Sequence, residues 1–86
     1  MSSFELCQVF LNLILYNFSM KIFAERLKSL RIENKLSQME LAKLVDVSQS
    51  GIKQWENAER IPNAEAVVKF AKFFGVSADY LLGLED

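Results

Sequence analysis

Apolar residues recur every three or four positions over most of the chain, which is the spacing of an α-helix that buries one face. Phe23, Leu27, Leu30 and Ile32 roughly follow this spacing and predict a helix over residues 22–33. No stretch alternates apolar and polar residues as a half-buried β-strand would. The pattern therefore predicts an all-α fold.

Short polar residues mark where further helices begin. Ser37 and Glu40 have the spacing of a capping box, in which the serine hydroxyl accepts from the Glu40 N–H and the Glu40 carboxylate accepts from the Ser37 N–H. They predict a helix that runs to about Leu44 and buries Leu41 and Leu44. Three more helices are expected after similar N-caps: they run from Ser48 to Glu56, from Asn63 to Gly75 and from Ser77 to Gly83.

The beginning of the chain differs in composition from the rest. Between Phe4 and Phe18 most residues are apolar and Glu5 is the only charge, whereas residues 21–86 carry ten basic and ten acidic side chains. We therefore divide the chain into an apolar N-terminal extension, residues 1–19, and a domain, residues 20–86.

Neither a signal peptide nor a transmembrane helix fits the extension. A signal peptide needs a basic leading region, which is missing here. A transmembrane helix needs about 20 mostly apolar residues, and Gln8, Asn12 and Asn17 interrupt a shorter stretch. An amphipathic helix fits better, because helical spacing aligns the polar residues on one stripe: Glu5, Gln8, Asn12, Tyr16 and Ser19.

The apolar surface left outside this stripe is too wide to remain in water. Self-association of the extension is favoured over packing on the domain, which makes it a candidate dimerisation helix. A protein partner for residues 4–18 stays open, as does translation from Met20 with residues 1–19 as an upstream read-through. A membrane surface is disfavoured, because the polar stripe lacks lysine and arginine.

The helices expected at about 38–44 and 48–56 are joined by about three residues, which is the layout of a helix-turn-helix over residues 37–56. Ala42 lies where the two helices cross and must be small. Ile52 and Trp55 are expected to fix the second helix against the core. Its outer face then carries side chains that can hydrogen-bond to base edges in the major groove: Gln49, Ser50, Lys53 and Gln54. Gly51 adds no bulk, so the backbone can approach a duplex closely.

Charge and reactive residues narrow the possible functions. The net charge of −1 argues by itself against a nucleic-acid partner, but no acidic side chain falls on the predicted outer face. The chain has no histidine and one cysteine, Cys7, which excludes an intrachain disulfide and a zinc site built by this chain. We expect no enzymatic activity, no metal and no cofactor, a reducing cytoplasmic location, and a buried, structural Cys7.

Residues 24–83 resemble the phage repressor and Cro family of helix-turn-helix regulators, also called the xenobiotic-response-element family. The resemblance is carried by several runs in register: Arg26-Leu27-Lys28-Ser29-Leu30-Arg31, Leu36-Ser37-Gln38 with Glu40-Leu41-Ala42, Val47-Ser48-Gln49-Ser50 with Ile52, Trp55-Glu56-Asn57, and Phe74-Gly75-Val76-Ser77 with Tyr80-Leu81-Leu82-Gly83.

This resemblance implies a compact five-helix, lambda-repressor-like domain that binds double-stranded DNA. Bases would be read by the outer face of the second motif helix, and Gln38 would also brace Gln49. Phosphates would be held by Gln38, Gly51, Asn57 and Arg60. Arg31 and Glu56 would form a structural ion pair. Asp46 stands where the family often has glycine, and a small stability cost is expected there.

The function implied is a transcriptional regulator, with a repressor that binds a palindromic operator as a homodimer as the leading hypothesis. The alternative is a protein-interaction module, such as the antitoxin of a toxin–antitoxin pair, which would use the apolar extension as its partner site.

Overall fold

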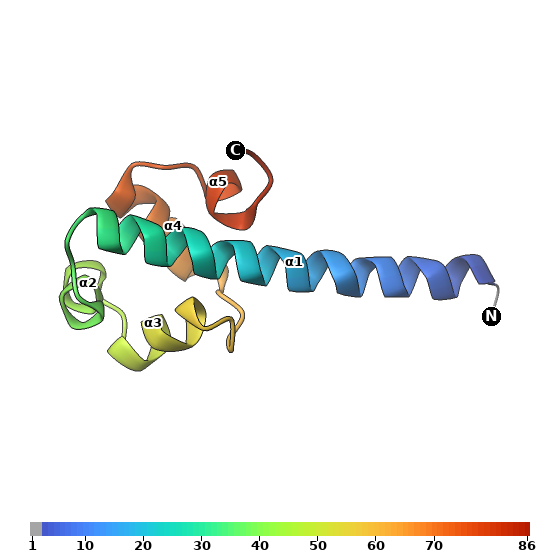
Figure 1. Cartoon of the computed structure of the whole chain (residues 1–86), viewed down its shortest axis with the longest axis horizontal. Coiled ribbons are helices and arrows are strands. Elements are labelled where there is room, and N and C mark those ends of the chain that lie inside the picture. Colours follow the sequence, from blue (N-terminus) through green and yellow to red (C-terminus); the bar gives the residue numbers. More distant parts are fainter. Residues whose placement is uncertain (1–2) are drawn as a thin grey trace.

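The protein is an all-helical molecule in which one long helix carries four short ones at its C-terminal end (Figure 1). The computed structural model describes the backbone of residues 3–86 and the side chains of residues 7–9, 11 and 18–86. Its helices are α1 (Ser3–Glu33), α2 (Gln38–Val45), α3 (Gln49–Glu56), α4 (Ala64–Phe74) and α5 (Ala78–Leu82). The predicted fold class is confirmed.

The short helices begin and end where their capping residues require. Ser37 and Glu40 form the expected capping box at the start of α2. The side chains of Ser48, Asn63 and Ser77 each accept a hydrogen bond from a backbone N–H in the first turn of α3, α4 and α5. Gly75 ends α4 in the left-handed conformation, at φ 69°.

The long helix α1 differs from the sequence-based prediction. The pattern predicts a helix over residues 22–33 that is separate from the extension, yet α1 runs without a break through Ser19 and Met20. The composition changes at this point, but no glycine or proline interrupts the backbone. The N-terminal half of α1 extends beyond the other helices (Figure 1), which gives the molecule its longest dimension of 49 Å.

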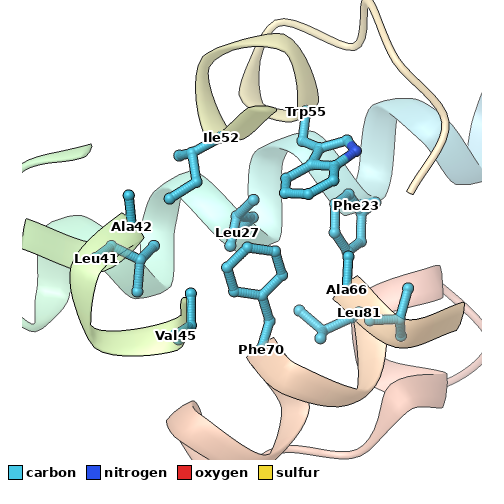
Figure 2. Packing of buried hydrophobic residues seen from close by; sticks show 11 residues of the cluster. Phe23, Leu27, Leu41, Ala42, Val45, Ile52, Trp55, Ala66, Phe70 and Leu81 are labelled. Atoms are coloured by element: carbon cyan, nitrogen blue, oxygen red, sulfur yellow. The ribbon is translucent and has the colours of Figure 1, made fainter. Parts of the chain in front are cut away.

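The core lies where the C-terminal half of α1 meets the four short helices (Figure 2). Phe23, Leu27 and Phe70 are at most 1% exposed. Trp55 packs edge-on against Phe70, with ring centroids 5.6 Å apart, so its predicted core position is confirmed. Its indole N–H is buried without an acceptor among the described residues, which costs about 1–3 kcal/mol.

Arg26 fastens α5 to α1. Its guanidinium lies 4.3 Å from the centre of the Tyr80 ring, donates to the Tyr80 carbonyl and reaches the Glu85 carbonyl at 2.7 Å. A cation over an aromatic face and two backbone acceptors together hold the C-terminal turn against the long helix.

Two predictions about burial are wrong. Leu44 is 59% exposed, and Val45, one position further along α2, is buried in its place. Cys7 is exposed rather than buried, because it lies on the half of α1 that extends beyond the core.

The side chains of Glu5, Asn12 and Tyr16, which form much of the predicted polar stripe, lie outside the described residues. Within the described part of the chain, no helix combines the length and the apolar character that crossing a bilayer requires.

Candidate nucleic-acid interface

The chain turns from α2 into α3 within three residues. Asp46 adopts a left-handed conformation at φ 58° and ψ 56°, and its N–H donates to the Ala42 carbonyl. The Val47 N–H donates to the same carbonyl at 3.0 Å. Ser48 then accepts from the Gly51 N–H at 3.0 Å and begins α3. These bonds give the helix-turn-helix layout that the sequence predicts.

Two opposite faces of α3 have different surroundings. Ile52 is fully buried and Trp55 is 4% exposed, and both point into the core (Figure 2). Ala42 is also buried, on the part of α2 that packs near Ile52 (Figure 2). The remaining face of α3 is exposed and polar: it carries Gln49, Ser50, Lys53 and Gln54. The residues predicted to read bases therefore share one accessible helical surface.

The ion pair expected between Arg31 and Glu56 is present and joins α1 to α3. Arg31 donates from Nε to Glu56 Oε2 at 2.6 Å and from Nη2 to Oε1 at 3.0 Å. Its Nη1 donates to the Leu36 carbonyl at 2.8 Å. The hydrogen bond to Glu56 raises the pKa of Arg31 above its usual value against the opposing effect of burial, so the guanidinium stays charged.

Gln38 belongs to the same cluster. Its side-chain amide donates to Glu56 Oε1 at 3.2 Å, which fixes the first residue of α2 against the last residue of α3. The expected contact between Gln38 and Gln49 is not among the hydrogen bonds of the described residues. Since an amide nitrogen carries two N–H groups, the contact with Glu56 leaves Gln38 one donor.

The loop after α3 places Arg60 beside the exposed face. Its guanidinium lies 5.3 Å from the centre of the Trp55 ring, so a core side chain supports an exposed cation. Asn57 is the C-cap of α3 and is exposed. A hollow of about 200 Å³ lies beside Arg60 between the start of α3 and α4, and its lining includes Ser48 and Lys69.

Gly51 packs closely against the cap of α3. It is buried, and its N–H already donates to Ser48. A Cβ at this position would lie 2.9 Å from Ser48 Oγ and 3.6 Å from Trp55. The phosphate contact of Gly51 stays a prediction; the packing shows that this position must be small so that α3 can keep its cap.

Lys69 is a part of this region that sequence reasoning missed. The residue has the pattern of an ordinary solvated lysine on α4, yet its Nζ donates to the Asp46 carbonyl at 3.0 Å and lies 3.3 Å from Glu65. It thus holds the turn between α2 and α3 from a helix 23 positions away. No local signal in the sequence indicates this contact.

Comparison with known proteins agrees with this geometry. A family model described as helix-turn-helix matches residues 27–81. The turn, the exposed face and most of the core fall within this match, and Phe23 of the core lies before it.

The relatives include both a transcriptional activator and repressors. The chain is 39% identical over 64 residues to the HTH-type transcriptional activator BcrR of Enterococcus faecalis, which covers 74% of this chain and 31% of that protein. It is 39% identical over 62 residues to the repressor protein C2 of Salmonella phage P22, which covers 72% of this chain and 29% of the repressor. A cryptic phage CTXphi transcriptional repressor, RstR of Vibrio cholerae, is 34% identical over 55 residues, or 64% of this chain and 50% of RstR. The match thus spans under a third of the first two relatives and half of the third.

Proposed function

This chain belongs to the helix-turn-helix family of transcriptional regulators, and from that premise we propose that it binds a palindromic operator as a homodimer, with α3 in the major groove. The observation that carries the proposal is the division of α3 into a buried face and an exposed polar face. Such a helix can enter the groove without exposing the core.

We assign the reading of bases to the exposed face of α3. A glutamine side chain can bind N6 and N7 of adenine in bidentate fashion, and a lysine can donate to O6 and N7 of guanine. Gln49 lies in the first turn of α3, and Lys53 lies one turn later, so both reach in the same direction. Ser50 and Gln54 are assigned to the neighbouring bases.

Phosphate contacts are assigned to residues that flank α3. Arg60, supported by Trp55 at the edge of the hollow, supplies a charge that is always present. Asn57 supplies an amide at the end of α3. Gln38 contributes the N–H that its bond to Glu56 leaves unused. Contacts of this kind fix the position of the protein on the duplex but carry no sequence information.

A homodimer is proposed because one module of this size gives limited affinity and because palindromic sites match two-fold symmetry. The half-sites of such an operator lie one helical turn apart, at about 34 Å. The N-terminal half of α1 has exposed apolar side chains for self-association outside the DNA-binding face: Val9 lies on one side of the helix, and Leu11 and Phe18 lie on the other.

Selection of bound duplexes from a random pool, followed by anisotropy titration, tests this proposal. We expect an enriched palindrome and a preference for it over random DNA. Gln49→Ala should reduce discrimination at one base pair per half-site by about 1–3 kcal/mol while binding to random DNA is retained.

Lys28→Gln, a change on the solvent side of α1, is the control and should keep the full preference. Equal affinity of the parent chain for selected and random duplexes would contradict the proposal. A chain that aggregates alone and becomes monodisperse only with a co-expressed protein would instead favour the antitoxin-like alternative.

A further inference from the structure

Helix α3 is held near both of its ends by a cation from another helix. At its C-terminal end, Arg31 of α1 donates to the Glu56 carboxylate at 2.6 Å. Just before its N-terminal end, Lys69 of α4 donates from Nζ to the Asp46 carbonyl at 3.0 Å. The sequence predicts the first of these contacts, whereas only the structure shows the second.

The turn before α3 is where support is needed. Asp46 is the C-cap of α2, and its left-handed backbone, at φ 58° and ψ 56°, carries a steric cost. Carbonyls at the C-terminal end of a helix lack partners within the helix, and a cation is favourable there. The ammonium group of Lys69 provides both a donor and a positive charge, because it bonds to the Asp46 carbonyl.

The Lys69 side chain is itself held in place. It is 31% exposed, so most of it is covered, and it lines the same hollow as Val47 and Ser48. The Glu65 carboxylate, one turn earlier on α4, lies 3.3 Å from its Nζ. Lys72, which follows on the same helix, is exposed. Lys69 thus has a fixed position between α4 and the turn that its neighbouring lysine does not share.

The base-reading face begins directly after this turn. Gln49 and Ser50 lie in the first turn of α3. Further along α3, Trp55 is anchored in the core, and Glu56 is fixed by its ion pair. If the bond from Lys69 were lost and the turn relaxed, the first turn of α3 would therefore move more than the last.

We propose that Lys69 is a positioning residue for base recognition, which acts through the Asp46 carbonyl and sets where the first turn of α3 meets the major groove. The proposal rests on the proposed function, because it concerns the same DNA-binding face. Lys69 needs no contact with a base or a phosphate for this role. Its loss should affect discrimination by Gln49 much more than discrimination by Gln54, which lies beside Trp55 in the last turn of α3.

A selective loss of discrimination tests the proposal. Gln49→Ala and Gln54→Ala first identify the base pair that each glutamine reads, by anisotropy titration against the selected duplex and its single-base variants. Lys69→Met should then lower discrimination at the Gln49 base pair by at least about threefold, since a good bidentate contact contributes about 5- to 150-fold. Discrimination at the Gln54 base pair should change by less than about twofold.

Two further variants separate positioning from charge. Lys72→Met removes the same charge from an exposed position of α4 and should leave discrimination at both base pairs unchanged. Lys69→Arg keeps a charged donor that can reach the Asp46 carbonyl and should restore most of the discrimination. The slope of log affinity against log salt should be the same for Lys69→Met and the parent chain, whereas a lost phosphate contact would lower its magnitude by about 0.9 per protomer.

Hydrogen exchange reports on the turn in the absence of DNA. The N–H groups of Asp46 and Val47 both donate to the Ala42 carbonyl, and Lys69→Met should speed their exchange by at least about threefold if the turn opens more often. The Asn57 N–H, which is bonded at the other end of α3, is the internal control and should exchange at the rate of the parent chain. Unchanged exchange at Asn57 also shows that Lys69→Met remains folded.

The outcomes for Lys69 and for the proposed function can be told apart. An equal loss at both base pairs, a shallower salt dependence, no loss at all, or unchanged exchange at Asp46 and Val47 would overturn the positioning role, even where the parent chain keeps its operator preference. A parent chain that binds all duplexes equally would overturn the proposed function and base reading with it. Faster exchange at the two amides would in that case still confirm that Lys69 holds the turn.

Discussion

At the scale of single residues, the Glu56 carboxylate joins the three helices α1, α2 and α3 at the candidate nucleic-acid interface. Its side chain is only 2% exposed and receives hydrogen bonds from Arg31 and Gln38. These bonds join the last turn of α3 to both α1 and the start of α2. A buried carboxylate needs such donors, because removing a charge from water costs several kcal/mol when no partner compensates for it.

Removing the guanidinium should therefore destabilise the protein strongly. Arg31→Met is expected to lower the free energy of unfolding by about 3 kcal/mol, because Glu56 would keep a buried charge without its main partner. The double change Arg31→Met with Glu56→Met should recover most of this loss. Urea unfolding of the two single variants and the double variant checks the prediction, and additive effects would contradict it.

Glu40 makes the cap of α2 dependent on pH. The backbone hydrogen bond from Ser37, followed by the contact with the Ser37 side chain, lowers the pKa of Glu40 below its usual value. A carboxylate whose pKa is lower in the folded state stabilises the fold above its unfolded pKa. This contribution is lost as the pH falls through the folded pKa.

Glu40→Gln keeps the capping-box geometry but cannot titrate. We expect the parent chain to lose stability relative to Glu40→Gln as the pH falls from 7 to about 3. Urea unfolding of both chains across this range measures the difference in their free energies of unfolding. The titration of the other carboxylates is common to both chains and cancels in this difference. A difference that stays constant with pH would count against the capping role.

At the scale of elements, the turn between α2 and α3 depends on Asp46 at φ 58°. A residue with a side chain pays a steric cost in this left-handed conformation. Lys69, which donates to the Asp46 carbonyl, supports the turn from α4. The helix-turn-helix angle is thus fixed partly by a strained residue and partly by α4.

Replacing Asp46 by glycine should relieve this strain. Asp46→Gly is expected to raise the free energy of unfolding by up to about 1 kcal/mol, because glycine adopts the left-handed conformation without the steric cost. Asp46→Val should destabilise, since a β-branched side chain fits there poorly. Thermal and urea unfolding report both changes; a destabilised Asp46→Gly would show that the carboxylate contributes more than it costs.

At the scale of the whole molecule, a net charge of −1 has to be reconciled with a polyanionic partner. The balance is local: Lys53 and Arg60 lie on or beside the exposed face of α3, and no acidic residue of α3 lies on that face, since Glu56 is held by Arg31. A molecule of this kind gains little from long-range attraction. Its affinity has to come mainly from contacts in the groove.

The salt dependence of binding should be correspondingly shallow. Each phosphate contact of a cation contributes about 0.9 to the slope of log affinity against log salt, so Arg60, the one cation per protomer assigned to a phosphate, gives a slope of roughly −2 for a dimer. Arg60→Gln should reduce the magnitude of this slope, whereas Lys28→Gln on the far side of α1 should not. Anisotropy titrations over a roughly fourfold range of salt, from about 50 to about 200 mM, would reveal the difference.

The sequence by itself determined the features that depend on near neighbours in the chain. Caps such as Ser37 and Asn63 bond to N–H groups within the next turn, so the starts of α2 and α4 could be read directly. The two faces of α3 follow from helical spacing around Ile52 and Trp55. The resemblance to the phage repressor and Cro family aligns the chain with that family's pattern, and it therefore also predicted the ion pair between Arg31 and Glu56.

Only the tertiary structure decided the features that depend on distant neighbours. The choice between Leu44 and Val45, which lie next to each other on α2, is set by where α4 packs. The need for a small residue at Gly51 comes from the Ser48 side chain and from Trp55. The role of Lys69 comes from its hydrogen bond to a carbonyl 23 positions away. A change in composition at residue 19 did not end α1, because a helix stops only where its backbone hydrogen bonds do.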